Sequence, residues 1–256
     1  MAVGKSGRGR ERPAGTGPEG VGEGMDLVRR CFETVAPVLE RSSDHLASLA
    51  ANARLASPHE AGRAAQLAGV AVRLLQAARR IRLAQQLALI ESGRLRKSLR
   101  PERFDLAAAV GEVVRRLKSL FAATGVDLAC PAVETPTEVV ADRERVLLVI
   151  RDLLEVCLAM TAAGGRVEVA LAPAGDGAEL TVSDTGVGMT RQELAGIFSS
   201  SGSPPVHEDY TGGIRDGLFV AREVVEACGG HMRAESVSGR GTRFSVVLPP
   251  AGGGSA

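Results

Sequence analysis

The sequence predicts an α+β fold in which an N-terminal helical hairpin is followed by a two-layer α/β sandwich. Apolar residues recur at spacings of three and four through residues 26–90, which indicates long amphipathic helices. After residue 104, short strand-like runs alternate with helical segments and glycine-rich turns, which is typical of helices packed on one face of a mixed sheet. The 256-residue chain is 45% hydrophobic but only 3% aromatic, so we expect an aliphatic core.

The composition argues against several protein classes. The formal net charge is +1, which favours neither a nucleic-acid partner nor a membrane surface. The cysteines are widely spaced and form no CxxC pair, which argues against a disulfide framework or a zinc site. The sequence has no run of about 18 apolar residues and no apolar segment near its N-terminus. We therefore expect a cytoplasmic protein without a membrane segment.

The first part of the chain is predicted to be a tail and a long helix. Residues 1–24 are mostly Gly, Arg, Pro and Glu, so they cannot bury enough apolar surface to offset ordering, and we expect a disordered tail. Asp26 is a suitable N-cap for the helix, and Pro37 is expected to kink it. Ser57-Pro58 predicts a turn and a fresh helix start.

A second long helix is predicted from about Glu60 to Ile90, with Ser92-Gly93 as its end. The two helices would form an antiparallel hairpin, and we assign residues 25–92 to a helical hairpin domain. Its apolar stripe is wider than one hairpin can cover alone. The economical solution is a second copy, which gives a dimeric four-helix bundle. The alternative is packing on the domain that follows.

Residues 93–103 are basic and include Pro101, and we expect them to be a linker. From Glu60 to Arg103 the chain carries ten Lys or Arg residues against three Asp or Glu residues. Such a run is usually a solvated face. The functional alternative is a docking surface for an acidic partner.

Residues 104–250 are predicted to form the α/β domain, and residues 251–256 a flexible tail. Asp105 and Asp142 are suitable N-caps for the first two helices of this domain. Ser199 to Gly213 is rich in Ser, Gly and Pro and predicts a loop. The expected elements are helices 106–121, 142–161 and 217–228, and strands 126–128, 138–140, 166–172, 179–183, 231–236 and 242–248.

The stretch from Asp184 to Met189, which reads DTGVGM, follows the strand-like run 179–183. A carboxylate at the end of a strand can accept a hydrogen bond from an exocyclic amine such as that of adenine. The two glycines, Gly186 and Gly188, let the backbone approach a ligand closely. On its own this pattern also fits a plain turn.

Three further segments accompany this turn in a definite order. Ile197-Phe198 lies in the loop that follows, residues 212–218 (GGIRDGL) mark a helix start that favours phosphate, and residues 239–244 (GRGTRF) lead into the last strand. The set resembles the ATP-binding domain of the family that joins gyrase, Hsp90, histidine kinases and MutL, a sandwich of the GHKL or Bergerat type. It is most similar to the C-terminal half of bacterial sensor histidine kinases, and the resemblance covers roughly Asp26 to Pro249.

The resemblance implies a histidine protein kinase of a two-component system. Such a protein is a homodimer through its helical hairpin, binds ATP, phosphorylates itself on a histidine and passes the phosphoryl group to an Asp of a response-regulator receiver domain. Asp184 would hold the adenine amino group, the loop Ser199–Gly213 would be an ATP lid, and Thr242 would support the adenine side through water. The nucleotide-binding residues that we expect are Asp152, Asp184, Gly186, Gly188, Gly213, Gly217, Leu218 and Thr242.

The helix before the glycine turn departs from the family pattern at the magnesium position. The family reads N-L-L-x-N-A with a Lys shortly after, whereas residues 152–157 read DLLEVC. Val156 replaces the Asn that would coordinate magnesium, and it has no oxygen to offer. Ala159 replaces the phosphate-facing Lys, and Glu155 points about 100° away around the helix. Asp152, one turn earlier, could supply one carboxylate to a metal, so we expect magnesium to help nucleotide binding little.

The second glycine segment departs from the pattern as well. Arg215 stands where the family has a Gly, and Asp216 stands where it has a Leu. An Arg at this position could bind phosphate, whereas the Asp beside it would repel it.

No histidine stands in the H-E-x-x-T-P motif of the family. His45 lies on the first helix at a suitable distance from Phe104, with Asp44 beside it as a possible general base. His59 precedes Glu60 but sits at the turn between the helices. We expect His45 to be the phosphoacceptor, with a plain surface histidine as the alternative.

Three functions fit these observations. The first is an ATP-dependent histidine kinase with receiver-domain phosphotransfer. The second is a catalytically degenerate relative that acts as a phosphotransferase in a phosphorelay or as an interaction scaffold, which Val156 and Ala159 favour. The third is another ATPase of the superfamily, such as an anti-sigma-factor serine kinase, which the long hairpin disfavours.

Overall fold

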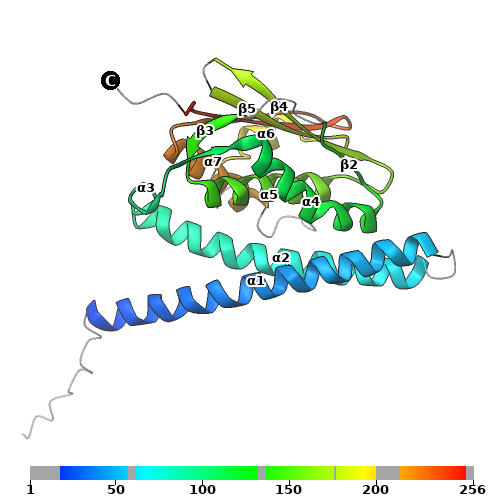
Figure 1. The fold of residues 1–256 in the computed structure, drawn as a ribbon, viewed down its shortest axis with the longest axis horizontal. Helices are drawn as coiled ribbons and strands as arrows, with labels where there is room; N and C mark the ends of the chain where they lie inside the picture. The colour runs from blue at the N-terminus through cyan, green and yellow to red at the C-terminus, as the bar shows by residue number, and fades with distance from the viewer. Residues whose placement is uncertain (1–17, 57–60, 132–136, 176, 200–213, 252–256) are drawn as a thin grey trace, which may run out of the picture.

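The structure is a computed structural model that describes residues 18–56, 61–131, 137–175, 177–199 and 214–251. The α+β prediction is confirmed: a helical N-terminal part is followed by helices and a mixed sheet (Figure 1). The elements are α1 (Pro18–Ala56), α2 (Ala61–Glu91), α3 (Leu95–Ser98), β1 (Glu102–Asp105), α4 (Leu106–Thr124), β2 (Asp127–Ala129), β3 (Glu138–Ala141), α5 (Arg143–Met160), β4 (Arg166–Ala174), β5 (Gly177–Asp184), α6 (Arg191–Ala195), α7 (Ile214–Ala227), β6 (His231–Val237) and β7 (Gly241–Leu248).

The described residues form a five-stranded sheet with the strand order β2-β4-β5-β7-β6. β2 pairs with β4 in parallel, and the other neighbours are antiparallel. β1 and β3 form a separate antiparallel pair. Helices α4, α5 and α7 cover one face of the large sheet, and the hairpin lies on the far side of these helices (Figure 1).

Strand β5 lies in the middle of the sheet and brings a carboxylate into the core. Its residues alternate between buried and half-buried, because successive side chains of a strand point to opposite faces. Ala178, Leu180 and Val182 are buried on one face, and Asp184 is the next residue on that face. The alternation therefore directs the Asp184 side chain toward the helix layer.

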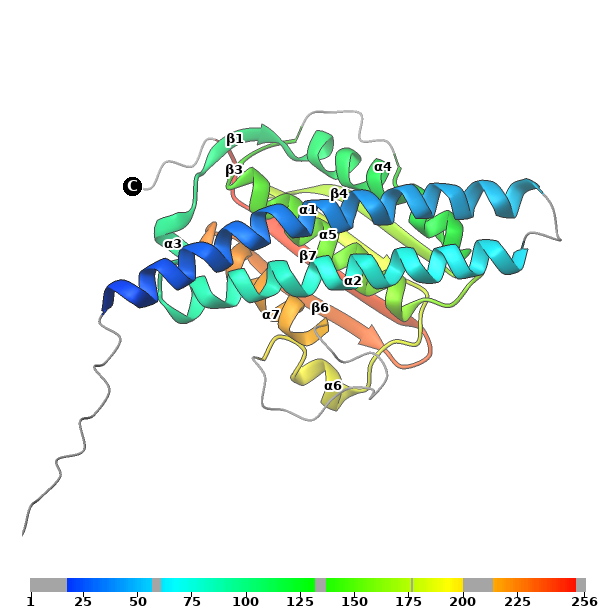
Figure 2. The same ribbon diagram turned by 90° about the horizontal axis from the view of Figure 1, so that it is seen from below.

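The helical hairpin packs on the rest of the chain. α1 and α2 run side by side along the helix layer and contact α4, and α2 also contacts α7 (Figure 2). Small buried side chains such as Ala47 and Ala71 allow this close approach, and Leu75 and Leu83 belong to the same apolar cluster as α4, α5 and α7. The hairpin thus packs partly on the following domain, which is the alternative to a second copy that the sequence left open. Val35 and other apolar residues of the hairpin stay exposed.

Three expectations need correction. α1 begins at Pro18, so residues 18–24 are helical and Asp26 lies inside the helix; Pro is favourable at the first helical position. Helix α1 continues through Pro37 to Ala56, and the kink at Pro37 stays a prediction. The expected linker 93–103 contains α3 and the start of β1, since pairing with β3 gives this segment a fixed place.

Other local predictions are confirmed. The Asp105 carboxylate accepts a hydrogen bond from the backbone of Ala107, and Asp142 accepts one from Arg145, so both residues are N-caps. The expected strands 166–172 and 179–183 lie within β4 and β5, which pair antiparallel. Along the described part of the chain, no helix combines the length and the apolar character that crossing a membrane requires.

Candidate functional site

Asp184 lies at the end of β5 with only 6% of its surface exposed. Its Oδ1 accepts a hydrogen bond of 2.8 Å from the backbone N–H of Gly186. Its Oδ2 is buried and has no hydrogen-bond partner among the described residues. Burial raises the pKa of this carboxyl, and the hydrogen bond from the Gly186 N–H partly opposes the rise. The Cys157 thiol and the Thr242 N–H oppose it as well, through contacts that do not meet hydrogen-bond geometry. A buried acceptor without a partner is the group that an amine donor of a ligand would satisfy.

The glycines of the turn are required by contacts within the chain. A methyl group on Gly186 would lie 2.1 Å from the carbonyl oxygen of Met160, and one on Gly188, whose φ is +64°, would lie 2.1 Å from that of Val237. A methyl group on Gly241 would lie 1.9 Å from the carbonyl oxygen of Asp184. The glycines thus hold the Asp184 turn between the end of α5 and the β6–β7 turn, so that the carboxylate has a fixed position.

Thr242 lies beside Asp184 on the neighbouring strand and is 4% exposed. Its hydroxyl is 3.0 Å from the hydroxyl of Ser236, which donates a hydrogen bond to the Gly241 carbonyl. The Ser236 hydroxyl also accepts a hydrogen bond of 2.8 Å from the backbone N–H of Met189. Ser236 therefore ties the glycine turn to β6 and β7, a role that the sequence analysis did not find.

The magnesium position on α5 is apolar. Val156 is 1% exposed and offers no oxygen. Asp152 lies one helical turn earlier and is also buried. Within the described ranges, no group of three or more His, Cys, Asp or Glu side chains is arranged to hold a metal ion. The described residues therefore do not fit a magnesium site of the family type.

A buried ion network occupies the position in front of Asp152. The Arg79 Nε lies 3.6 Å from an oxygen of Asp152 and 3.9 Å from one of Glu155. Arg82 lies 3.5 Å from Asp152 and 3.4 Å from Glu155, and it also pairs with Glu40 of α1. Burial raises the pKa of Glu155, and the charges of Arg82 and the other arginines oppose the rise. The basic run on α2 thus has acidic partners inside the same chain.

Arg151 of α5 completes this network from the other side. It pairs with Glu40 at 2.7 Å and with Glu155 at 2.8 Å. The network therefore contains three arginines and three carboxylates from α1, α2 and α5: Glu40, Arg79, Arg82, Arg151, Asp152 and Glu155. Equal numbers of opposite charges allow this set to be buried together.

The start of α7 lies against Arg79. A methyl group on Gly217 would lie 2.1 Å from the Arg79 Nη2, so the guanidinium occupies the space that this glycine leaves open. Leu218 is fully buried, and Gly213 lies outside the described residues. Arg215 donates a hydrogen bond of 3.0 Å to the Gly196 carbonyl after α6. The start of α7, where the phosphate groups are expected, is thus in contact with helix α2 of the hairpin.

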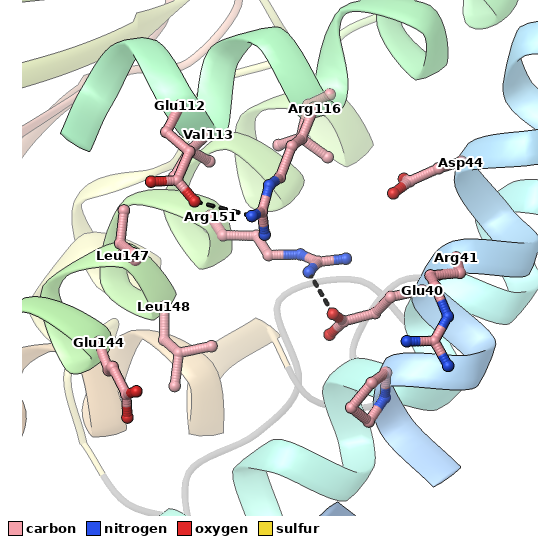
Figure 3. A pocket seen from close by; sticks show the side chains of 12 residues that line it. Glu40, Arg41, Asp44, Glu112, Val113, Arg116, Glu144, Leu147, Leu148 and Arg151 are labelled. Carbon is pink, nitrogen blue, oxygen red and sulfur yellow. Dashed lines mark ion pairs between the residues drawn. The ribbon is translucent and has the colours of Figure 1, made fainter. Parts of the chain in front are cut away.

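His45 and Asp44 point in different directions from α1. His45 is exposed, whereas Asp44 is half-buried and lines a groove of about 630 Å³ between α1, α4 and α5. Asp44 faces Arg116 and Arg151 across the groove (Figure 3), and burial raises its pKa while the charge of Arg151 opposes the rise. Successive residues of a helix are about 100° apart, which explains the divergence.

The other candidate histidines lie elsewhere. His59 and His207 are outside the described residues. His231 is exposed at the start of β6. None of these positions brings a described imidazole next to Asp184.

Comparisons with known proteins agree with this geometry. A family model described as "Histidine kinase-, DNA gyrase B-, and HSP90-like ATPase" matches residues 141–252. This part of the chain is similar to that family. The ATPase domain includes Asp152, Asp184, Gly217 and Thr242, and the predicted relationship to sensor histidine kinases is confirmed.

Two curated relatives are sensory kinases of cyanobacteria. The adaptive-response sensory kinase SasA of Parasynechococcus marenigrum is 32% identical over 150 residues, which are 58% of this chain and 39% of SasA. The circadian input-output histidine kinase CikA of a Synechocystis strain is 34% identical over 112 residues, which are 43% of this chain and 15% of CikA. The chain therefore spans well under half the length of these relatives.

Two solved structures share the fold. Full-length ShkA in complex with AMPPNP matches with a TM-score of 0.54 at 19% identity, over 88% of this chain and 47% of ShkA. The nucleotide-free catalytic domain of the histidine kinase ThkA matches with a TM-score of 0.52 at 20% identity, over 59% of this chain and 95% of that domain. These likenesses show that the ATPase domain has the histidine kinase fold.

Sequence reasoning missed the residues that reach the site from a distance. Arg79 and Arg82 belong to the basic run, but their spacing alone does not point to α5. In the sequence, Cys157 looks like one more apolar residue of its helix, and nothing there indicates that it contacts Asp184. In the structure, burial and the charge of Asp184 raise the pKa of its thiol well above the ordinary value. The thiol thus stays protonated beside the Asp184 carboxylate.

Proposed function

We propose that this chain is a two-component signalling protein of the sensor histidine kinase type whose ATPase domain binds an adenine nucleotide. The observation that carries the proposal is the buried Oδ2 of Asp184, which has no hydrogen-bond partner among the described residues. An adenine amino group would supply the missing donor. Thr242 would support the adenine side, and Gly186 and Gly188 would keep the turn in place for the ligand.

The phosphate groups would then extend toward the start of α7. Gly213, Gly217 and Leu218 are the residues that we propose for this side, because the first backbone N–H groups of a helix attract anions. ATP is the proposed nucleotide. Since Val156 offers no oxygen and Asp152 is paired with arginines, we expect nucleotide affinity to change little when magnesium is removed.

For phosphotransfer we propose His45 as the acceptor of the γ-phosphoryl group of ATP, with ADP as the leaving product. The phosphoryl group would pass from His45 to an Asp of a response-regulator receiver domain. The exposure of His45 supports access by such a partner. Asp44 faces the groove and not His45. It can act as the general base for His45 only if α1 or the Asp44 side chain rotates.

We also propose that residues 25–92 form the dimerisation and phosphotransfer domain, and residues 104–250 the nucleotide-binding domain. The exposed apolar residues Val35, Val38 and Leu49 of α1 support a homodimer through the hairpin. A second copy would cover this stripe, as in a four-helix bundle.

A second candidate function is that of a degenerate relative, either a phosphotransferase or an interaction scaffold. The buried Val156 and the absence of a lysine at Ala159 favour it, because both remove groups that act on the triphosphate. In this case His45 would receive its phosphoryl group from a phosphorylated receiver domain and would need no ATP.

The first test measures adenosine and ADP binding by calorimetry on the wild type and on Asp184→Asn, with magnesium and with EDTA. We expect binding that Asp184→Asn weakens at least about tenfold, the equivalent of one lost charged hydrogen bond, and that EDTA leaves unchanged. Binding that needs magnesium would refute the metal-independent site.

A second test separates the two candidate functions. The wild type and His45→Ala are incubated with labelled ATP and, separately, with a labelled phospho-receiver domain, and acid-labile phosphate is mapped. Label from ATP on His45 supports the kinase, and label only from the receiver supports the phosphotransferase. Label that persists in His45→Ala removes His45 as the acceptor.

A further inference from the structure

The Arg79 guanidinium is buried at the phosphate side of the site with hydrogen-bond capacity left over. Arg79 is 8% exposed, and its Nε and Nη2 have no hydrogen-bond partner among the described residues. Its contacts with Asp152 and Glu155, at 3.6 and 3.9 Å, are ion pairs longer than hydrogen bonds. Buried donors without partners are costly, so these N–H groups point to an acceptor that is still to bind.

The position of these donors fits an anion. The Nη2 lies against Gly217, in the first turn of the 14-residue helix α7. Backbone N–H groups in the first turn of a helix lack intrahelical partners, and the helix dipole favours negative charge there. A guanidinium beside such a helix start presents its donors in the fork that matches two phosphate oxygens.

A phosphate can approach the start of α7 only if the arginines offset the negative charges of the nearby carboxylates. Asp152 and Glu155, which are buried, and Asp216 in the first turn of α7 would repel an anion, and the described residues offer no metal site to compensate. Arg79 and Arg82 balance the two buried carboxylates. An arginine keeps its charge at all ordinary pH values, so it can replace a divalent cation as a fixed positive group.

The arginines also lie at a suitable place relative to Asp184. Cys157 contacts Asp184, and Asp152, which faces Arg79, lies five residues earlier on the same helix, about 7.5 Å along its axis and about 140° around it. Helices α5 and α7 pack against each other, so both ends of the site share one wall. One nucleotide spans this distance between its base and its phosphates.

We propose that Arg79, supported by Arg82, binds the phosphate groups of the adenine nucleotide that Asp184 holds, in place of the Asn and the Lys of the family that Val156 and Ala159 replace. The inference rests on the proposed function, because it assumes that the base enters at Asp184. It assigns to the hairpin a direct part in the nucleotide site. Gly217 is then required to admit the guanidinium.

The test compares ADP, adenosine and inorganic pyrophosphate by calorimetry in EDTA on the full chain. In the wild type we expect ADP to bind more tightly than adenosine, because only ADP reaches Arg79. Arg79→Ala should weaken ADP binding at least about tenfold, the value of a lost charged hydrogen bond, and leave adenosine binding unchanged. Arg80→Ala, which removes the neighbouring exposed charge, should change neither.

The outcomes separate the two proposals. If Arg79→Ala binds ADP more tightly than the wild type does, the guanidinium blocks the phosphate position. If the two bind ADP equally, Arg79 does not contact the phosphates. Either result overturns the inference, whereas adenosine binding by the wild type still supports the adenine site. Pyrophosphate that binds as tightly as ADP overturns it in favour of a free-phosphate site. Adenosine that fails to bind the wild type overturns both. Circular dichroism checks the fold, and Arg79→Gln, which keeps the length of the side chain, replaces Arg79→Ala if that variant unfolds.

Discussion

A single residue, Asp184, is buried in the core and is also the residue that we propose to bind the adenine. The alternation of β5 places its carboxylate on the buried face, where burial raises its pKa. The Gly186 N–H satisfies one oxygen, and the other oxygen remains for a ligand. The side chain thus costs stability in the free protein, because a buried acceptor stays unsatisfied until a donor binds.

The first prediction concerns the pH dependence of stability. With a raised pKa in the folded chain, Asp184 binds a proton in the folded state over a pH range in which the unfolded chain has released it, so stability falls as pH rises through that range. Asp184→Asn removes this titration. Its free energy of unfolding relative to the wild type should therefore rise between the ordinary carboxyl pKa of 3.8 and neutral pH. Urea denaturation at several pH values measures this difference, and parallel profiles would contradict the prediction.

At the scale of elements, the site depends on how closely two turns and the C-terminal end of α5 approach one another. The Asp184 turn hydrogen-bonds to α5 through Val187 N–H and the Met160 carbonyl at 3.2 Å. It meets the β6–β7 turn, whose Gly239 N–H donates to the Val187 carbonyl. Glycines make this approach possible because a Cβ atom at these positions would overlap neighbouring backbone.

The second prediction compares two glycines of the β6–β7 turn. Gly239 and Gly241 both have positive φ, of +76° and +98°, so an alanine at either position carries backbone strain of about 1–2 kcal/mol. A methyl group at Gly239 meets nothing within 4 Å, whereas one at Gly241 would lie 1.9 Å from the Asp184 carbonyl oxygen. Gly241→Ala should therefore destabilise the chain more than Gly239→Ala does and should also weaken adenosine binding. Equal effects in denaturation and calorimetry would show that close approach at Gly241 is unimportant.

At the scale of the whole molecule, the hairpin and the ATPase domain share a buried apolar cluster and an ion network. The network joins α1 and α2 to α5 through paired charges. Removal of one partner is strongly destabilising, because it leaves a buried charge unpaired. The opposite side of α1 carries the apolar residues Val35, Val38 and Leu49, each more than 40% exposed. One side of the hairpin thus packs on its own chain, and the other carries the surface that we propose for a second copy.

The third prediction tests that surface. Val38→Glu places a charge in the exposed stripe of α1, where Val38 is 46% exposed, so it should weaken the proposed dimer because a buried unpaired charge is costly. Light scattering after gel filtration should show a dimer for the wild type and a monomer for Val38→Glu. Val237→Glu is the matched control, since Val237 is 58% exposed at the end of β6, and it should remain dimeric. A monomeric wild type over a range of concentrations would contradict the dimer.

The sequence by itself determined the features that depend on neighbours in the chain. Helical and alternating periodicity predicted the hairpin and the sheet strands, and Asp105 and Asp142 were correctly identified as helix caps. The glycine turn and the order of the segments that follow it predicted the relationship to histidine kinases. Short segments such as α6 were missed, because they carry too few residues for a periodic signal.

Only the tertiary structure decided what Arg79 contacts and which side of the hairpin is covered. Arg79 and Asp152 are far apart in the sequence, and their pairing follows from packing α2 on α5 and α7. No local pattern encodes such a contact, because charge alone does not specify a partner. The sequence therefore determined where the turn that carries Asp184, the proposed adenine site, lies, and the packing of the hairpin decided that Arg79 lies beside Asp152 and Gly217.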